Sequence, residues 1–489
     1  KCREITNADA GSLYVVETNR EGERILRFQV SQNDSVAVNY TQATIPIDPR
    51  SIAGYVACTG ESLSIPDVYD LPESAPFTIN RDFDTSTGYR SRSMLAVPMT
   101  NREGEVVGIV QLINCKRRAQ AKLTSAEIVA REVIPFGEME KQLAHFLAGQ
   151  AAIALENHRL LQSIEDLFEG VVTASVTAIE SRDPSTSGHS ERVATMTVAL
   201  AERIGAIERG RFRDIHFTPM QLKELRYAAI LHDFGKVAVR EDVLLKARKL
   251  HPAQFRLLEQ RFAYARRTLE ARCLEEQLAV LLERGEAGRA ALPEIERRYA
   301  VRIARLVEDF SIVVAANEPR ILPQEASRRL WEIAATRIEE PDGTTFPLLT
   351  PEELSILSIP RGSLDEAERR EIESHVRHTR RFLERIPWPN GLERVPEIAA
   401  MHHEKLDGSG YPNRLRGSQI PIEVRMMTIT DIYDALTASD RPYKKAVPPD
   451  RALDILSDSA RKGELDAEVL DVFITDRIYR SIETKQRGR

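Results

Sequence analysis

The sequence predicts two folds in one chain, an N-terminal α+β domain with an antiparallel sheet flanked by helices, and an all-α bundle joined to it by a long helix. Three observations predict this. Residues 1 to about 140 form short β-type runs separated by turns, and apolar residues then recur at helical or heptad spacing. Beyond about 165, no run of alternating apolar and polar residues is long enough to predict a strand. At 489 residues the chain is also too long for a single hydrophobic core.

The strands expected in the first domain, residues 1–155, are short. They fall at Ser12–Glu17, Ile25–Val30, Ser62–Ile65, Ser93–Pro98 and Val106–Ile113. The last two are separated by Thr100–Glu105, which contains Gly104, so this pair is predicted to form a β-hairpin.

A connecting helix is expected at 145–170, where apolar residues recur at roughly heptad spacing. These residues are Phe146, Ile153, Leu160, Leu161 and Leu167. The spacing leaves two interpretations open. The helix is either the seam of a parallel coiled coil in a homodimer or a passive spacer.

The helical half, 165–489, contains a segment at about 255–363 with a different composition. It is dense in Glu, Arg and Leu, and acids and bases often lie three or four residues apart, as in Arg272 with Glu275. This pattern predicts a helical hairpin inserted into the bundle and projecting from its surface. It is either a solvated insertion or an arm that binds a partner or a second copy.

Composition narrows the class of protein. A formal charge of −6 and a pI near 6.1 give no general reason to bind a nucleic-acid polymer. The four cysteines include no CxxC pair, and the apolar runs fall short of the ~20 residues of a membrane span. We therefore expect a cytoplasmic protein. Because the first residue is Lys1, a preceding segment can still carry an anchor or a signal.

Histidines cluster with acids in the helical half. His232 and Asp233 directly follow an apolar helical face, and adjacent helical residues project ~100° apart, so the pair can reach two metals or one metal and a bridging position. His402 and His403 precede a loop rich in Gly and Pro. Imidazole and carboxylate ligands favour iron, manganese or zinc over calcium. Two such metals would activate water against a phosphate ester.

Residues 1–155 resemble a GAF domain. The resemblance rests on the stretches Thr6–Tyr14, Ser93–Pro98 and Gly108–Asn114. In the members that bind cyclic nucleotides an Asn-Lys pair follows the last of these strands, whereas here Asn114 is followed by Cys115 and then Lys116. The resemblance implies a sensory domain with a small-molecule ligand, whose identity stays open.

The segment from about 165 to 480 resembles the HD-GYP family of HD phosphohydrolases. Four motifs occur in the family's order, at Gly188–Val193, Leu231–Lys236, His402–Pro412 and Asp431–Lys444. The resemblance implies an all-helical bundle with a dinuclear centre of iron or manganese. It also implies hydrolysis of cyclic di-GMP to pGpG or onward to GMP.

Carried over position by position, the family's metal ligands fall on seven residues. They are His189, His232, Asp233, His375, His402, His403 and Asp431. Asp233 is expected to bridge the metals. In the family one further ligand is a histidine, but direct register puts Arg261 at its position. His375 is chosen instead, because the family pattern resumes only after the insertion. Some members hold a third metal through a Glu before the first His. Here the nearest acid is Asp183, which favours two metals.

The resemblance also implies residues that act on the substrate. The catalytic candidates are His232, Asp233 and Lys236, and the substrate-binding candidates are Lys236, Tyr411, Asp434, Arg441 and Lys444. Arg441 is suited to hold phosphate bidentately. Asp434 lies on the helical face of Asp431 and either orients a ligand or guanine or stays a solvated carboxylate. In the family, the loop of Tyr411 shapes the substrate site and contacts GGDEF-type cyclases.

Three functions stay open at this point. The first is a cyclic di-GMP phosphodiesterase regulated by a GAF domain. The second is an HD-type phosphohydrolase that acts on another nucleotide or another cyclic dinucleotide. The third is a sensor that binds cyclic di-GMP without hydrolysing it, although candidate ligands at all seven positions argue against a decayed site.

Overall fold

The computed structural model describes the chain except residues 20, 37–43, 183–186, 341, 439–445 and 483–489. It divides into two compact units, Lys1–Glu169 and Gly170–Arg489. No described helix combines the length and the apolar composition that crossing a membrane requires.

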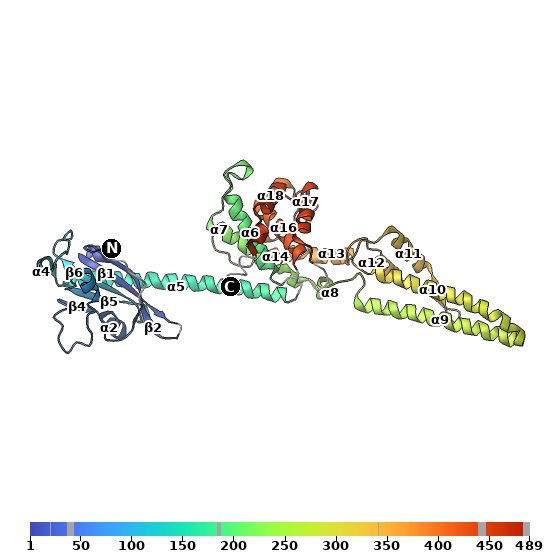
Figure 1. The fold of residues 1–489 in the computed structure, drawn as a ribbon, viewed down its shortest axis with the longest axis horizontal. Coiled ribbons are helices and arrows are strands. Elements are labelled where there is room, and N and C mark those ends of the chain that lie inside the picture. Colours follow the sequence, from blue (N-terminus) through green and yellow to red (C-terminus); the bar gives the residue numbers. More distant parts are fainter. Residues whose placement is uncertain (20, 37–43, 183–186, 341, 439–445, 483–489) are drawn as a thin grey trace. The chain divides into compact units, whose positions relative to one another are not determined.

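The first unit is built on a seven-stranded antiparallel sheet (Figure 1). The strand order is β3-β2-β1-β6-β5-β4, and β7 pairs with β6. Its elements are α1 (Cys2–Ile5), β1 (Ala8–Thr18), β2 (Arg24–Asn33), β3 (Thr44–Pro46), α2 (Ile52–Thr59), β4 (Leu63–Ile65), α3 (Asp82–Thr87), β5 (Met94–Thr100), β6 (Val106–Lys116), α4 (Ala126–Glu132) and β7 (Val133–Ile134). The hairpin predicted from the sequence is confirmed, since β5 pairs with β6 along its length.

Both faces of this sheet are covered, because side chains alternate along each strand. On β5, Met94 and Ala96 join the core on the side of α2, whereas Leu95 and Val97 join the core on the opposite side. That second core is closed by alanines of α5 (Glu138–Glu180), among them Ala148. The expected antiparallel sheet flanked by helices is thereby confirmed, and α5 is the predicted long helix.

The second unit is largely helical, as the sequence predicts. Its main elements are α6 (His189–Gly205), α7 (Pro219–Leu231), the 3₁₀ turn η3 (Phe234–Ala238), α8 (Glu241–Leu244), α13 (Glu366–Glu373), α14 (His375–Leu383), α15 (Val395–Ala399), α16 (Ile422–Thr437), α17 (Pro449–Arg461) and α18 (Ala467–Thr475). Helix α6 packs on α7 and α16, α15 packs on α7 and α14, and α14 packs on η3. These contacts bring distant parts of the sequence to one place.

The insertion forms its own core within this unit. Helices α9 (Pro252–Arg284) and α10 (Leu292–Ala316) lie side by side (Figure 1), followed by α11 (Gln324–Ala335) and α12 (Pro351–Leu357). Its apolar cluster includes Phe262 and Val313. The N–H of Lys249 donates to the carbonyl of Asn317 (3.0 Å), and Lys246 Nζ reaches Glu368 at 2.7 Å. The ends of the insertion therefore lie close together, so that the bundle tolerates its length.

One expectation for this half is wrong. Strands β8 (Arg337–Glu339) and β9 (Thr345–Pro347) form a two-stranded antiparallel sheet within the insertion. Each has only three residues, which is too short to show alternation in the sequence. The overlooked signal is the Asp342–Gly343 pair between them, where Gly343 has a φ of 86° that favours glycine.

Candidate metal centre

All seven predicted metal ligands meet in the second unit. Their ring nitrogens and carboxylate oxygens form overlapping groups within which the atoms lie within 4.8 Å of one another. The groups are His375, His402 and His403, then His189, His232 and Asp233, and finally His232, His402 and Asp431. The residues come from the start of α6, the end of α7, the start of α14, the turn after α15 and the middle of α16.

A glycine lets the two halves of this cluster approach. A Cβ on Gly235 would lie 1.9 Å from the carbonyl oxygen of His375, so no other residue allows η3 to pass this close to α14. The hydroxyl of Thr379 accepts from the Gly235 N–H (2.8 Å) and donates to the carbonyl of His232 (2.9 Å). The His232–Asp233 turn is thereby fixed against the helix that carries His375.

Three imidazoles are oriented in the same way. The Nδ1–H of His232, His375 and His402 donates to the backbone carbonyl three residues earlier, at 2.6 to 2.7 Å. Each Nε2 is then left with a lone pair that faces the cluster. His232 Nε2 is buried and has no hydrogen-bond partner among the described residues. Buried nitrogens are rarely left unpaired, and this arrangement is typical of histidines that bind a metal.

The carboxylate of Asp233 faces two different sets of histidines. Its Oδ2 lies 3.3 Å from His232 Nε2 and 3.9 Å from His189 Nε2. Its Oδ1 lies 3.4 Å from His375 Nε2 and 3.9 Å from His402 Nε2. A carboxylate placed in this way can bridge two cations, one on each side.

Burial and neighbouring charges set the protonation of the cluster. Burial lowers the pKa of His402 well below its ordinary value and that of His403 to about 4, so both imidazoles stay neutral. Burial alone would raise the pKa of Asp233, but Lys236 and His232 hold it well below its usual range. Ionised carboxylates beside neutral imidazoles are the protonation state that metal binding requires.

His189 and His232 differ from the other histidines of the cluster, because carboxylates beside them raise their pKa; for His232, burial alone would lower the pKa, but the charge of Asp233 raises it. Burial alone would also lower the pKa of His189, but hydrogen bonds to Asp431 and Asp434 raise it to about 9. Its Nε2 lies 3.1 Å from Asp431 Oδ1. The proton at this position is the one that a bound cation would displace.

Asp434 binds Nδ1 of His189, whereas Nε2 of the same ring faces Asp431. The Oδ2 of Asp434 accepts from His189 Nδ1 (2.7 Å), and Arg192 donates to both oxygens, at 2.8 Å through Nε and 3.0 Å through Nη2. Asp434 is 1% exposed, so the alternative of a solvated surface carboxylate is wrong. The role of Arg192 was missed, although its position three residues after His189 on one helical face signalled it.

The Tyr411 loop borders the cluster. The ring centroid of Tyr411 lies 4.7 Å from that of His403, and burial raises the pKa of its hydroxyl, which therefore stays protonated. The buried carboxylate of Glu404, another residue that the sequence did not single out, accepts the N–H groups of Asn413 (2.6 Å) and Leu415 (2.9 Å). These bonds fix the loop in place.

The remaining candidates divide into three cases. Lys236 lies at the cluster, with Nζ 2.8 Å from Asp233 Oδ2. Arg261 lies in the insertion, paired with Glu353 at 2.5 Å, and is not part of the candidate metal groups of the described residues. Arg441, Lys444 and Asp183 lie outside the described residues.

Comparison with protein families places two kinds of domain on the chain. A GAF domain model matches residues 1–155, and two HD domain models match residues 186–309 and 347–469. The first HD match contains His189, His232 and Asp233, and the second contains the other four residues of the cluster. Because the seven form one cluster, the two matches are parts of one site separated by the insertion.

Curated relatives include phosphodiesterases from Vibrio cholerae. The chain is 41% identical over 105 residues to 3'3'-cGAMP-specific phosphodiesterase 3, which covers 22% of each chain. It is 25% identical over 329 residues to cyclic di-GMP phosphodiesterase, which covers 66% of this chain and 44% of the relative. The chain thus spans less than half the length of these relatives.

Solved structures are similar to part of the chain. The GAF domain of a phosphoenolpyruvate-protein phosphotransferase from Coxiella burnetii is 21% identical and covers 32% of this chain and 76% of that one, with a TM-score of 0.23. A methyl-accepting chemotaxis protein is 18% identical and covers 32% of this chain and 84% of that one, with a TM-score of 0.25.

HD domains are metal-dependent, and the candidate ligands lie within the HD matches. The chain therefore carries an N-terminal GAF domain followed by a largely helical HD region.

Proposed function

We propose that the chain is a metal-dependent phosphodiesterase that hydrolyses cyclic di-GMP to pGpG or GMP under the control of its GAF domain. The observation that carries the proposal is the position of Asp233, whose two oxygens face two different sets of histidines. Relatives named cyclic di-GMP phosphodiesterase or probable cyclic di-GMP phosphodiesterase align with 64% to 66% of this chain, which supports the substrate. We propose 1–155, 145–170 and 165–489 as sensory domain, connecting helix and catalytic domain.

The donor set fits two divalent metals, for which we propose iron or manganese. His189, His232 and Asp431 would hold the first, and His375, His402 and His403 the second, with Asp233 shared between them. The described cluster contains no thiolate, and the unpaired Nε2 of His232 is suited to a metal. Metals bound there would supply Lewis acidity to the phosphate diester.

The chain's own residues would position the substrate. Lys236, at the edge of the cluster, would donate to a phosphate oxygen, and the protonated hydroxyl of Tyr411 would donate beside His403. Asp434 would orient His189, because its oxygens face His189 and Arg192. We propose Arg441 and Lys444 as phosphate ligands on the strength of the family pattern alone.

The substrate has a second candidate. Relatives named 3'3'-cGAMP-specific phosphodiesterases are 41% and 48% identical to this chain over 105 and 90 residues. Anaerobic turnover of cyclic di-GMP and 3'3'-cGAMP by the metal-loaded chain decides between the two. We expect cyclic di-GMP to be hydrolysed faster and His402→Ala to abolish turnover, whereas His216→Ala, an exposed histidine elsewhere, should not change it. Tight binding without turnover would instead indicate a sensor.

We further propose a homodimer formed through α5. Its outward face carries two rows at heptad spacing. The first row is Met139, Phe146, Ile153, Leu160 and Leu167. The second row is Leu143, Gln150, Asn157, Ile164 and Val171. The first row is 41% to 70% exposed, while alanines on the opposite face are buried in the GAF core. This is the pattern of a coiled-coil seam, and its polar positions Gln150 and Asn157 would fix the register.

Two smaller proposals complete this assignment. The exposed edge of the Tyr411 loop, at Asn413 and Arg414, is the surface we propose for a GGDEF-type cyclase, and loss of pull-down in Arg414→Glu would test it. We propose a cytoplasmic location, with which the four free cysteines agree.

A further inference from the structure

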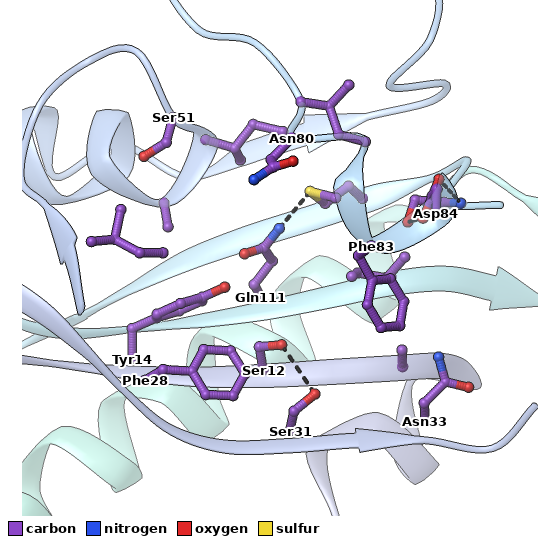
Figure 2. Close-up of a pocket in the computed structure, with 18 of the residues that line it drawn as sticks. Ser12, Tyr14, Phe28, Ser31, Asn33, Ser51, Asn80, Phe83, Asp84 and Gln111 are labelled. Atoms are coloured by element: carbon purple, nitrogen blue, oxygen red, sulfur yellow. Dashed lines mark hydrogen bonds between the residues drawn. The ribbon is translucent and has the colours of Figure 1, made fainter. Parts of the chain in front are cut away.

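The GAF domain has a partly open cavity of about 290 Å³ between its sheet and the segment that lies over it (Figure 2). The floor is formed by β1, β2, β5 and β6, and the cover by the start of α2 and residues 78–84. This volume lies at the lower end of the range for small-molecule sites. One or two rings suit it better than a cyclic dinucleotide.

The lining combines aromatic rings with uncharged polar groups. Tyr14 and Phe28 lie in edge contact, with ring centroids 5.1 Å apart, and Phe83 faces them across the cavity (Figure 2). Between them lie the hydroxyl of Ser12 and the amide of Gln111. The cavity therefore offers apolar contact to a flat ligand and hydrogen bonds to its edge.

The cavity has no cationic side chain to receive an anion. None of the described residues that line it is Lys, Arg or His. Lys116, which the sequence placed near this strand end, is 2% exposed and bound to Asp9 (3.0 Å) and Asp34 (3.1 Å). A phosphate in the cavity would lose its hydration without gaining a counter-charge, which is strongly unfavourable.

Among the described residues that line the cavity, the one acid is Asp84, and its oxygens already accept hydrogen bonds. Asp84 Oδ2 accepts from the Tyr69 hydroxyl (2.7 Å) and the Ser91 N–H (2.7 Å), and Oδ1 accepts from the Ser91 hydroxyl (2.8 Å). Three neutral donors of the protein therefore already hydrogen-bond to the two oxygens of Asp84.

Gln111 is the group that points to a ligand. It is 8% exposed, and its Nε2 donates only to the thioether of Met94 (2.7 Å), which is a weak acceptor. Its Oε1 accepts no hydrogen bond from any described residue. A buried amide in this state gains free energy from a partner that offers a donor and an acceptor side by side.

We propose that this cavity binds an uncharged, planar nitrogen heterocycle with an amide or lactam edge, held by the Gln111 amide. The same cavity excludes ligands that carry phosphate or carboxylate, including cyclic nucleotides and the proposed substrate of the HD domain. The assignment concerns the sensory domain and does not depend on the proposed phosphodiesterase activity.

Calorimetric titration of the full chain tests this with a matched pair of probes. Nicotinamide and nicotinate have the same size and ring but differ in charge. We expect nicotinamide and the lactam hypoxanthine to bind at millimolar concentration or better, and nicotinate to bind at least tenfold more weakly than nicotinamide. Gln111→Leu should weaken the neutral probes at least tenfold. Gln32→Leu, an exposed position on β2, should leave them unchanged.

Two results would overturn the assignment. One is nicotinate or 3',5'-cyclic GMP binding at least as tightly as the neutral probes. The other is no detectable binding of either neutral probe. Because binding is measured without turnover, either result leaves the phosphodiesterase proposal to its own test.

Discussion

At the residue scale, His189 is held by side chains that lie outside the cluster itself. Asp434 accepts from its Nδ1, and Arg192 holds Asp434 through two donors of one planar guanidinium. Such partners of a metal-binding histidine fix its ring orientation and raise its basicity. Arg192 is therefore a positioning residue that acts through Asp434.

Arg192→Lys tests this role. Lys keeps the charge but loses the bidentate geometry, so we expect metal affinity to fall about 10- to 100-fold. Metal titration followed by calorimetry measures it, and excess metal should restore turnover. Arg226→Lys, which alters a half-exposed ion pair with Glu191 between α6 and α7, is the control. Unchanged affinity in Arg192→Lys would show that the contact is only structural.

At the element scale, α5 uses its two faces differently. Ala144, Ala148 and Ala152 pack against the sheet, and the heptad rows project from the other side. Exposed apolar residues in an unbroken heptad row are costly in a monomer, which is the physical reason to expect a partner helix.

Leu160→Lys is expected to shift the chain from dimer to monomer, because the charge would be buried in the coiled-coil seam. Light scattering or analytical ultracentrifugation of the full chain measures this. Gln162→Lys adds the same charge two residues away, off the seam, and should leave the dimer intact. A monomeric native chain would contradict the proposed dimer.

Elements with local patterns were predictable from the sequence, whereas contacts between distant segments were not. The β5–β6 hairpin follows from two β-type runs split by a turn that contains Gly104, α5 follows from heptad spacing, and the paired histidines signalled the candidate metal centre. The hydrogen bond from Arg192 to Asp434 joins residues 242 positions apart. The need for a residue without a Cβ at Gly235 arises only where η3 contacts α14. No local pattern carries such information. The three-residue strands β8 and β9 were missed because they are too short.

At the scale of the whole molecule, the candidate metal groups found among the described residues all lie in the second unit. A ligand that binds only the folded state stabilises it by about 2.7 kcal/mol at 100 times its Kd. We therefore expect a chelator to lower the thermal transition of the second unit by several degrees and to leave that of the first unit unchanged. Calorimetry of the full chain, followed by return of metal, measures both. Equal shifts in both transitions would contradict this prediction.

Asp233 is the residue that the two proposed metal positions share. The most direct measurement is the number of metal ions per chain, determined by elemental analysis under anaerobic conditions for the native protein, Asp233→Asn and Asp242→Asn. Asp242 is an exposed acid in α8 and serves as the control. We predict two ions per chain in the native protein and the control, and one or none in Asp233→Asn. Two ions retained in Asp233→Asn would contradict a bridging carboxylate and the dinuclear centre built on it.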